Sequence, residues 1–310
     1  MPKTAAALLF TVALAMPALA ADQTQTFATS KGAVAITPIY HATARITAGG
    51  DTIYIDPAKP AKIDGLAPGG LILITDIHGD HMDADDVKAL SNAGTVVIAP
   101  AAVAKTITQA KPLANGDSTT WHGWKITAVP MYNITHNQPS GQPFHDKGRG
   151  NGYVLNYGGK NFYFAGDTEG TPEMKALKDI DLAFVPMNLP YTMTPTEAAD
   201  AVKAFKPKVA IPYHYKGQDV EVFKKALEGS GVEVRLLEWY PQEQTNSMAA
   251  ERRPCHLRGH HHEDTCARRG RIRIACHTGA GTVRHHLAQR RHRHPCPSGP
   301  RQRAARHRCR

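Results

Sequence analysis

An unbroken apolar run, LILI at 71–74, leads through Thr75 into a cluster of polar residues, DIHGDH at 76–81. A run that is apolar at every position is typical of a strand buried on both faces of its sheet. Polar side chains where such a strand ends are costly to bury unless something pairs with them. A metal ion would do so, because Asp and His are ordinary metal ligands. The run therefore predicts a metal site at the end of a buried strand.

The spacing within this cluster is suited to two ions. In extended backbone, residues two apart point to the same side, so Asp76 and His78 can share one ion. Gly79 then lets the chain turn sharply, which presents Asp80 and His81 to a second ion. Oxygen and nitrogen donors of this kind suit divalent cations such as Zn²⁺ or Mn²⁺.

Strand-like and helix-like segments alternate between residues 27 and 240, bounded by Gly, Pro, Asn or Asp. We expect strands at 34–40, 52–55, 71–75, 95–98, 124–129, 153–157, 161–164, 182–185 and 209–211. We expect helices at 84–93, 102–110, 171–178, 196–205 and 220–229. The early strands form hairpins with Gly-rich turns and the later ones alternate with helices. This pattern predicts an α/β fold, with helices covering sheets, in one domain spanning 21–242.

The net charge of +10 comes from the end of the chain, because Arg is concentrated after Tyr240 and the body is nearly neutral. A nearly neutral body without a basic stripe argues against a nucleic-acid partner or a membrane-surface partner. All five cysteines also lie after Tyr240. The body therefore has no cysteine nucleophile and no disulfide framework.

Residues 1–20 combine Lys3, an apolar stretch at 5–16 and the small residues ALA before Ala21. This pattern predicts a cleaved signal peptide and a periplasmic or secreted protein. The apolar stretch is shorter than the roughly 20 residues that cross a bilayer, so we expect no membrane association after cleavage.

The segment 243–310 is rich in Arg, His, Cys, Pro and Gly. It has too little apolar surface to offset chain entropy, so we expect it to be disordered. Three origins remain open: out-of-frame or read-through translation or a cloning remnant, a basic adhesive tail, and a Cys/His metal-binding module. The third is disfavoured because the segment has no CxxC pair with zinc-finger spacing.

Three more segments place a ligand-type residue at or just after an apolar stretch: His136 in ITH, Asp167 in FAGDT and His214 in IPYH. With them the sequence resembles the metallo-β-lactamase superfamily. The signature of that superfamily is an HxHxDH loop, a lone His, a bridging Asp after Gly, and a final His. The motifs DxHxDH, NGYVL, AGDTEG and MNLPYTM look more closely like its ascorbate-6-phosphate lactonase-like (UlaG-like) branch.

The resemblance covers about 34–240 and implies a four-layer αββα sandwich, with the site at one edge between two sheets. It implies two divalent metal ions as cofactors, zinc first, with manganese or iron as alternatives. It assigns seven metal ligands: Asp76, His78 and His136 at one ion, Asp80, His81 and His214 at the other, and Asp167 between them.

Asp76 departs from the family pattern, which usually has His at this position. Two divalent ions, three carboxylates and a bridging hydroxide would sum to a neutral site, whereas His in place of Asp76 would leave one positive charge. The additional carboxylate makes the ligand set harder and should weaken its Lewis acidity. Manganese and iron thereby become stronger competitors to zinc.

The resemblance implies a hydrolase in which a metal-bridged hydroxide cleaves an ester, lactone or phosphoester of a small-molecule substrate. Asp80 would orient the hydroxide and accept its proton. In the loop 144–150, His145, Lys147 and Arg149 are candidates to bind an anionic group or to protonate the leaving group. A solvated loop without a catalytic role is the alternative for them.

Four other residues are assigned on less specific sequence patterns. Asn188 and Tyr191 are expected to line the substrate pocket. Asp56 follows a strand and is expected either to form a turn or to support a metal-binding histidine. His41 is expected to be a hydrogen-bonded structural residue.

Three other functions stay open. β-Lactamase activity is disfavoured by Asp76 and by the lactonase-like motifs. An iron-dependent oxidoreductase on the same fold would be supported by a flavodoxin-like domain, and the sequence shows none. A noncatalytic metal-binding protein is disfavoured because all seven assigned positions hold competent ligands.

Overall fold

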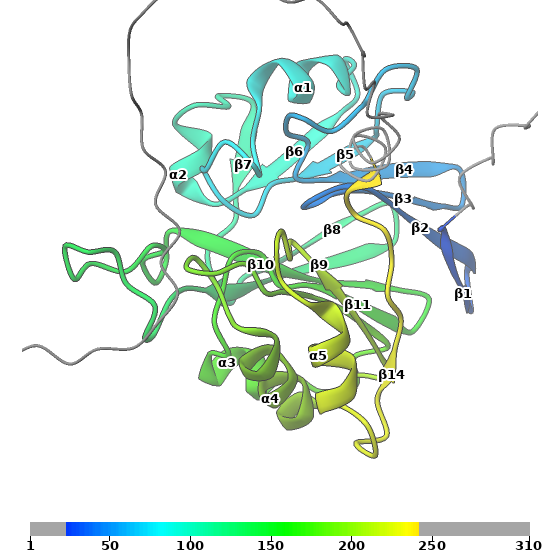
Figure 1. Cartoon of the computed structure of the whole chain (residues 1–310). Coiled ribbons are helices and arrows are strands. Elements are labelled where there is room, and N and C mark those ends of the chain that lie inside the picture. The colour runs from blue at the N-terminus through cyan, green and yellow to red at the C-terminus, as the bar shows by residue number, and fades with distance from the viewer. Residues whose placement is uncertain (1–22, 242–310) are drawn as a thin grey trace, which may run out of the picture. The chain divides into compact units, whose positions relative to one another are not determined.

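The computed structural model describes residues 23–241 (Figure 1). The predicted signal peptide at 1–20 and the tail at 243–310 lie outside the described residues. Within the described part, no helix has the length and apolar character needed to cross a membrane.

The first half of the described chain builds a seven-stranded sheet in chain order. Its elements are β1 (Gln25–Thr29), β2 (Gly32–Tyr40), β3 (Thr43–Ala48), β4 (Asp51–Ile55), β5 (Leu71–Leu73), α1 (Ala84–Ala89), β6 (Val96–Ala99), α2 (Ala101–Ala104) and β7 (Ala110–Pro112). Strands β1 to β4 pair antiparallel and β4 to β7 pair parallel. The tight β3–β4 turn is made by Gly49 and Gly50, which both have positive φ, as a short hairpin requires.

The second half repeats this plan in a second seven-stranded sheet. Its elements are β8 (Ser118–Trp121), β9 (Trp124–Met131), β10 (Gly150–Tyr157), β11 (Lys160–Phe164), α3 (Pro172–Lys175), β12 (Leu182–Pro186), α4 (Pro195–Phe205), β13 (Val209–Tyr213), α5 (Val220–Ala226) and β14 (Glu233–Val234). Strands β8 to β11 pair antiparallel and β11 to β14 pair parallel. Helices supply the crossovers that parallel strands need.

The two sheets lie between two layers of helices (Figure 1). Side chains from both sheets, including Ile36, Ile46 and Phe164, form the buried core between them. Val87 of α1 and Val103 of α2 belong to a second core on the first sheet, and α4 and α5 cover the second sheet through a third. The predicted four-layer αββα sandwich is confirmed.

One expected helix is partly wrong. The expected helix at 102–110 ends at Ala104, and Ala110–Pro112 is strand β7. The sequence TIT at 106–108 is β-branched throughout, which disfavours helix, and Ala110 instead pairs with Val97 of β6.

The polar residues singled out in the sequence follow parallel strands. Asp56 follows β4, Asp76 follows β5, Asp167 follows β11 and His214 follows β13. Ligands of α/β folds commonly bind beyond the carboxyl ends of such strands. The fold therefore brings these side chains to one edge of the sandwich.

Candidate metal centre

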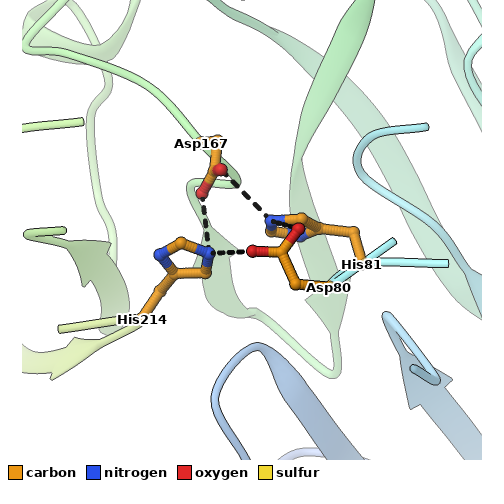
Figure 2. Close-up of side chains that lie close together, drawn as sticks. All are labelled: Asp80, His81, Asp167 and His214. Carbon is orange, nitrogen blue, oxygen red and sulfur yellow. Dashed lines mark hydrogen bonds and ion pairs between the residues drawn. The ribbon is translucent and has the colours of Figure 1, made fainter. Parts of the chain in front are cut away.

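Two clusters of ligand-type side chains lie at this edge. The first consists of Asp76, His78 and His145, and the second of Asp80, His81, Asp167 and His214 (Figure 2). Within each cluster, one nitrogen or oxygen atom from every residue lies within 4.8 Å of the others. The structure thus brings together six of the seven assigned ligands and adds His145.

Asp167 joins the two clusters. Its Oδ2 atom lies 3.2 Å from His81 Nε2 and 3.2 Å from His145 Nε2, while its Oδ1 atom lies 3.3 Å from His214 Nε2. Gly166, which precedes it, has a φ of 67°, and this left-handed turn is open to glycine at no steric cost. Burial would raise the pKa of Asp167, but His214 and His81 outweigh it and hold the pKa well below its usual value.

The ring of His81 is fixed from behind by Asp56. Asp56 Oδ2 accepts a hydrogen bond from His81 Nδ1 over 2.9 Å, and Asp56 Oδ1 accepts one from the Thr75 N–H over 2.7 Å. His81 Nε2 is therefore left to face Asp167. Burial opposes protonation of His81, but Asp167 and Asp56 raise its pKa well above the usual value. Asp56 both occupies a turn, with a φ of 45°, and supports a histidine.

Asp80 is held between two histidines. Its Oδ2 atom lies 3.2 Å from His214 Nε2 and 3.2 Å from His41 Nε2. His41 Nδ1 lies 2.7 Å from the Tyr240 hydroxyl, so the predicted hydrogen-bonded His41 also reaches the second cluster. Burial alone would raise the pKa of Asp80, but the hydrogen bonds from His214 and His41 hold it far below its usual range. Burial, together with the charge of His214, lowers the pKa of His41 to about 4.

The first cluster is built around the fully buried carboxylate of Asp76. Its Oδ2 atom lies 3.0 Å from His78 Nδ1 and 3.8 Å from His145 Nε2. His145 Nδ1 lies 2.8 Å from Asn133 Oδ1, which also accepts the His145 backbone N–H. Since Asn133 orients the ring through Nδ1, His145 Nε2 is left to face the cluster.

His136 lies outside the first cluster, which corrects the expected grouping. Its Nε2 atom lies 3.0 Å from the Glu197 carboxylate instead. The cause is Glu169, whose carboxylate accepts the backbone N–H groups of residues 134, 135 and 136 and so fixes the path of this loop. His145, expected to bind an anion or donate a proton, occupies the place expected for His136.

The donor atoms of the clusters fit metal ions. His81 Nε2, His145 Nε2 and Asp167 Oδ1 are buried and make no hydrogen bond of good geometry. Buried polar atoms are almost always paired, and here both histidine nitrogens lie near Asp167 Oδ2 while Asp167 Oδ1 lies near His214 Nε2. Imidazole nitrogen and carboxylate oxygen together form a ligand set that binds divalent cations.

A pocket of about 550 Å³ opens over the clusters. It is lined by His78, Gly79, Asp80, Gln138, Phe144, His145, Arg149, Asp167 and Tyr191. Tyr191 is one of the lining residues, with its ring edge-on to Phe144 at a centroid distance of 5.0 Å. A small molecule can therefore reach both clusters.

Three other predicted substrate residues are placed differently. Asn188 is not among the residues that line this pocket, and its backbone forms the turn before α4. Lys147 lies 2.6 Å from the Glu173 carboxylate. Arg149 lines the pocket, but its guanidinium is paired with Asp76. Neither cation is left unpaired for an anionic group.

Comparison with known proteins shows to which family the chain belongs. A sequence profile described as "Beta-lactamase superfamily domain" matches residues 35–214. The chain belongs to the beta-lactamase superfamily. The superfamily resemblance inferred from the motifs is thereby confirmed.

Relatives within the beta-lactamase superfamily narrow the assignment. A protein named "UPF0173 metal-dependent hydrolase" from Thermococcus onnurineus is 34% identical over an alignment of 212 residues, which covers 61% of this chain and 90% of the relative. At this identity and coverage, the chain belongs to the same family of metal-dependent hydrolases.

Solved structures agree on the fold. A proposed metal-dependent hydrolase from Parabacteroides distasonis is 41% identical, with a TM-score of 0.66 over 69% of this chain and 98% of that chain. The metallo-beta-lactamase fold protein YhfI from Bacillus subtilis is 14% identical, with a TM-score of 0.54 over 66% of this chain and 95% of that chain. The second likeness concerns the fold alone.

Proposed function

We propose that the protein is an exported hydrolase that uses two divalent metal ions, one in each cluster, to cleave a neutral ester or lactone. The observation that carries this proposal is the position of Asp167, which lies in the pocket and contacts residues of both clusters. We propose zinc as the metal, because four of the seven ligand-type residues are histidines and imidazole suits zinc.

Metal ions in such a site activate water and polarise the bond under attack. Asp80 is the group of this chain that we propose receives the proton. Its side chain is 44% exposed and lines the pocket. His41 and His214 hold its orientation.

The charges around the pocket support a neutral substrate. Among the described residues that line it, Arg149 is the one lysine or arginine, and it is paired with Asp76. A charged phosphoester is best held by an unpaired cationic side chain, and the lining residues offer none. An ester or lactone carbonyl needs no such partner. The MNLPYTM and AGDTEG motifs support the lactonase-like assignment.

Export is proposed from the N-terminal signal pattern at 1–20. To test this, the protein is expressed in a bacterium and recovered from the periplasmic fraction. Its intact mass then shows where the chain begins. We expect a chain that begins at Ala21. Cytoplasmic protein that retains residues 1–20 would contradict export without bearing on the hydrolase.

The hydrolase is tested with the full chain, measured for metal content by elemental mass spectrometry and for turnover of an ester, a lactone, a phosphodiester and a β-lactam. The variant is His78→Ala. The matched control is His122→Ala, since His122 is an exposed histidine paired with Asp51. Metal held by the tail is the same in all three proteins and cancels in the comparison.

We expect the wild type and His122→Ala to turn over the ester or lactone. We expect His78→Ala to lose about one metal ion per chain and at least about 100-fold in kcat/KM. Turnover of the phosphodiester alone would overturn the substrate class. Unchanged turnover in His78→Ala, or a wild type without metal beyond that of the tail, would overturn the proposed mechanism.

A further inference from the structure

Arg149 and Asp76 form a two-point ion pair beside the first cluster. Arg149 Nε donates to Asp76 Oδ1 over 3.2 Å and Arg149 Nη2 donates to Asp76 Oδ2 over 2.9 Å. The Asp76 side chain is fully buried and that of Arg149 is 22% exposed. A guanidinium that binds both carboxylate oxygens fixes the plane of the carboxylate as well as its charge.

The backbone around this pair is built for close approach. The Asn151 N–H donates to the Thr75 carbonyl over 2.9 Å, which holds the start of β10 against the end of β5. A Cβ atom at Gly150 would lie 3.0 Å from the Thr75 carbonyl oxygen and closer still to the Met131 side chain. Glycine at this position therefore lets Arg149 and Asp76 meet although 73 residues separate them.

Asp76 Oδ2 faces the guanidinium and the cluster at once. It accepts from Arg149 Nη2 and also lies 3.0 Å from His78 Nδ1. The guanidinium binds both Asp76 oxygens, while His78 and His145 lie near Oδ2. A carboxylate oxygen has more than one lone pair, so pairing with Arg149 leaves Oδ2 able to act as a metal ligand.

We propose that Asp76 and Arg149 act as a single neutral ligand unit, which takes the place of the neutral histidine usual at position 76 in this superfamily. The charge of Asp76 is cancelled by a guanidinium at fixed distance, so the site regains the positive charge that the carboxylate alone would remove. Arg149 is thus a positioning residue for the first cluster. Arg149 thereby offsets the charge that Asp76 adds to the site, while the donor atom remains an oxygen.

This inference rests on the proposed metal site and is tested on metal affinity rather than on turnover. The Zn²⁺ dissociation constant of the full chain is measured by competition with a chelating dye. The four proteins are the wild type, Arg149→Gln, Asp76→His, and the variant with both substitutions. The matched control is Arg235→Gln, because Arg235 also binds a carboxylate at two points, that of Glu233, at the protein surface.

We expect Arg149→Gln to weaken Zn²⁺ binding when position 76 is Asp and to strengthen it when position 76 is His. With Asp76 present, the substitution removes the partner that fixes the Asp76 carboxylate. Zn²⁺ binding should then weaken about 10- to 100-fold, as loss of a supporting partner commonly causes. With His at position 76, the guanidinium faces only an imidazole and a cation, so its removal strengthens binding by about tenfold. Arg235→Gln should change neither.

The outcomes separate the two proposals. If Arg149→Gln shifts the affinity in the same direction with Asp and with His at position 76, Arg149 acts as an isolated charge and the ligand-unit proposal fails. If the wild type binds no Zn²⁺ beyond a tail-only background, the proposed function fails first. If a Gln variant does not fold, Arg149→Lys replaces it. Because lysine keeps the charge but not the two parallel bonds, it should weaken Zn²⁺ binding with Asp76 and leave the affinity unchanged with His at position 76, and an equal loss in both backgrounds would overturn the proposal.

Discussion

Asp56 Oδ2 accepts a hydrogen bond from His81 Nδ1 over 2.9 Å, and both side chains are fully buried. The bond fixes a proton on Nδ1, so Nε2 is the nitrogen that faces Asp167 and would bind a metal ion. Carboxylates behind metal-binding histidines commonly set the tautomer and the ring orientation in this way. The ligand geometry of the second cluster thus depends on a residue that does not line the pocket.

We expect Asp56→Asn to weaken metal binding by about 10- to 100-fold. The substituted amide would turn a donor toward the Thr75 N–H or hydroxyl, both of which now donate to Asp56. The resulting unpaired groups should also cost about 1–3 kcal/mol in the free energy of unfolding. Zn²⁺ titration and urea denaturation measure the two effects. Asp51→Asn, at an exposed histidine pair, is the control, and an equal effect there would contradict the prediction.

The positions of His145 and His136 predict opposite results for the two alanine variants. His145→Ala should lose metal from the first cluster and at least about 100-fold in kcat/KM, because His145 Nε2 faces Asp76 and Asp167. His136→Ala removes a partly exposed contact with Glu197 and should keep its metal content. Elemental analysis of the two purified variants distinguishes them, and loss of metal in His136→Ala alone would show that the sequence-based grouping was right.

The low pKa of His41 predicts a pH-dependent stability of the metal-free protein. Folding lowers the pKa from 6.5 to about 4, so the folded state favours the neutral imidazole. The contribution is complete above about pH 6.5 and is lost as the pH falls toward 4, up to about 3 kcal/mol. Urea denaturation of chelator-treated protein at about pH 7 and about pH 4.5 measures this loss. His41→Gln should lack this component, and an equal pH dependence in both proteins would argue against it.

Glu169 is predicted to be the main anchor of the loop that precedes the pocket. Its carboxylate accepts three successive backbone N–H groups, at residues 134, 135 and 136, and it is buried. Glu169→Gln replaces one acceptor oxygen with a donor, which should lower the free energy of unfolding by about 2–3 kcal/mol. Thermal and urea denaturation check this value. Glu228→Gln, at an exposed position, should change stability by less than about 0.5 kcal/mol.

The elements that could be predicted from the sequence are those with a clear pattern. Strands β9 to β13 carry apolar residues that become buried, so their pattern is visible in the sequence. The short strand β7 has only Ala110 buried, and β14 is two residues long. These strands exist because a neighbouring strand offers hydrogen bonds, which is a tertiary effect and leaves no periodic pattern.

The sequence by itself indicated the type of site in this protein, a cluster of side chains that can bind metal ions. The apolar run before Asp76, together with the polar residues after other strands, placed ligands at strand ends, because a buried strand has no other place for them. The tertiary structure alone decided which histidine completes the first cluster and what balances Asp76. Glu169 and Asn133 direct the loops that carry His136 and His145. Arg149 meets Asp76 across 73 residues. Such contacts depend on how distant segments pack together, which local pattern does not encode.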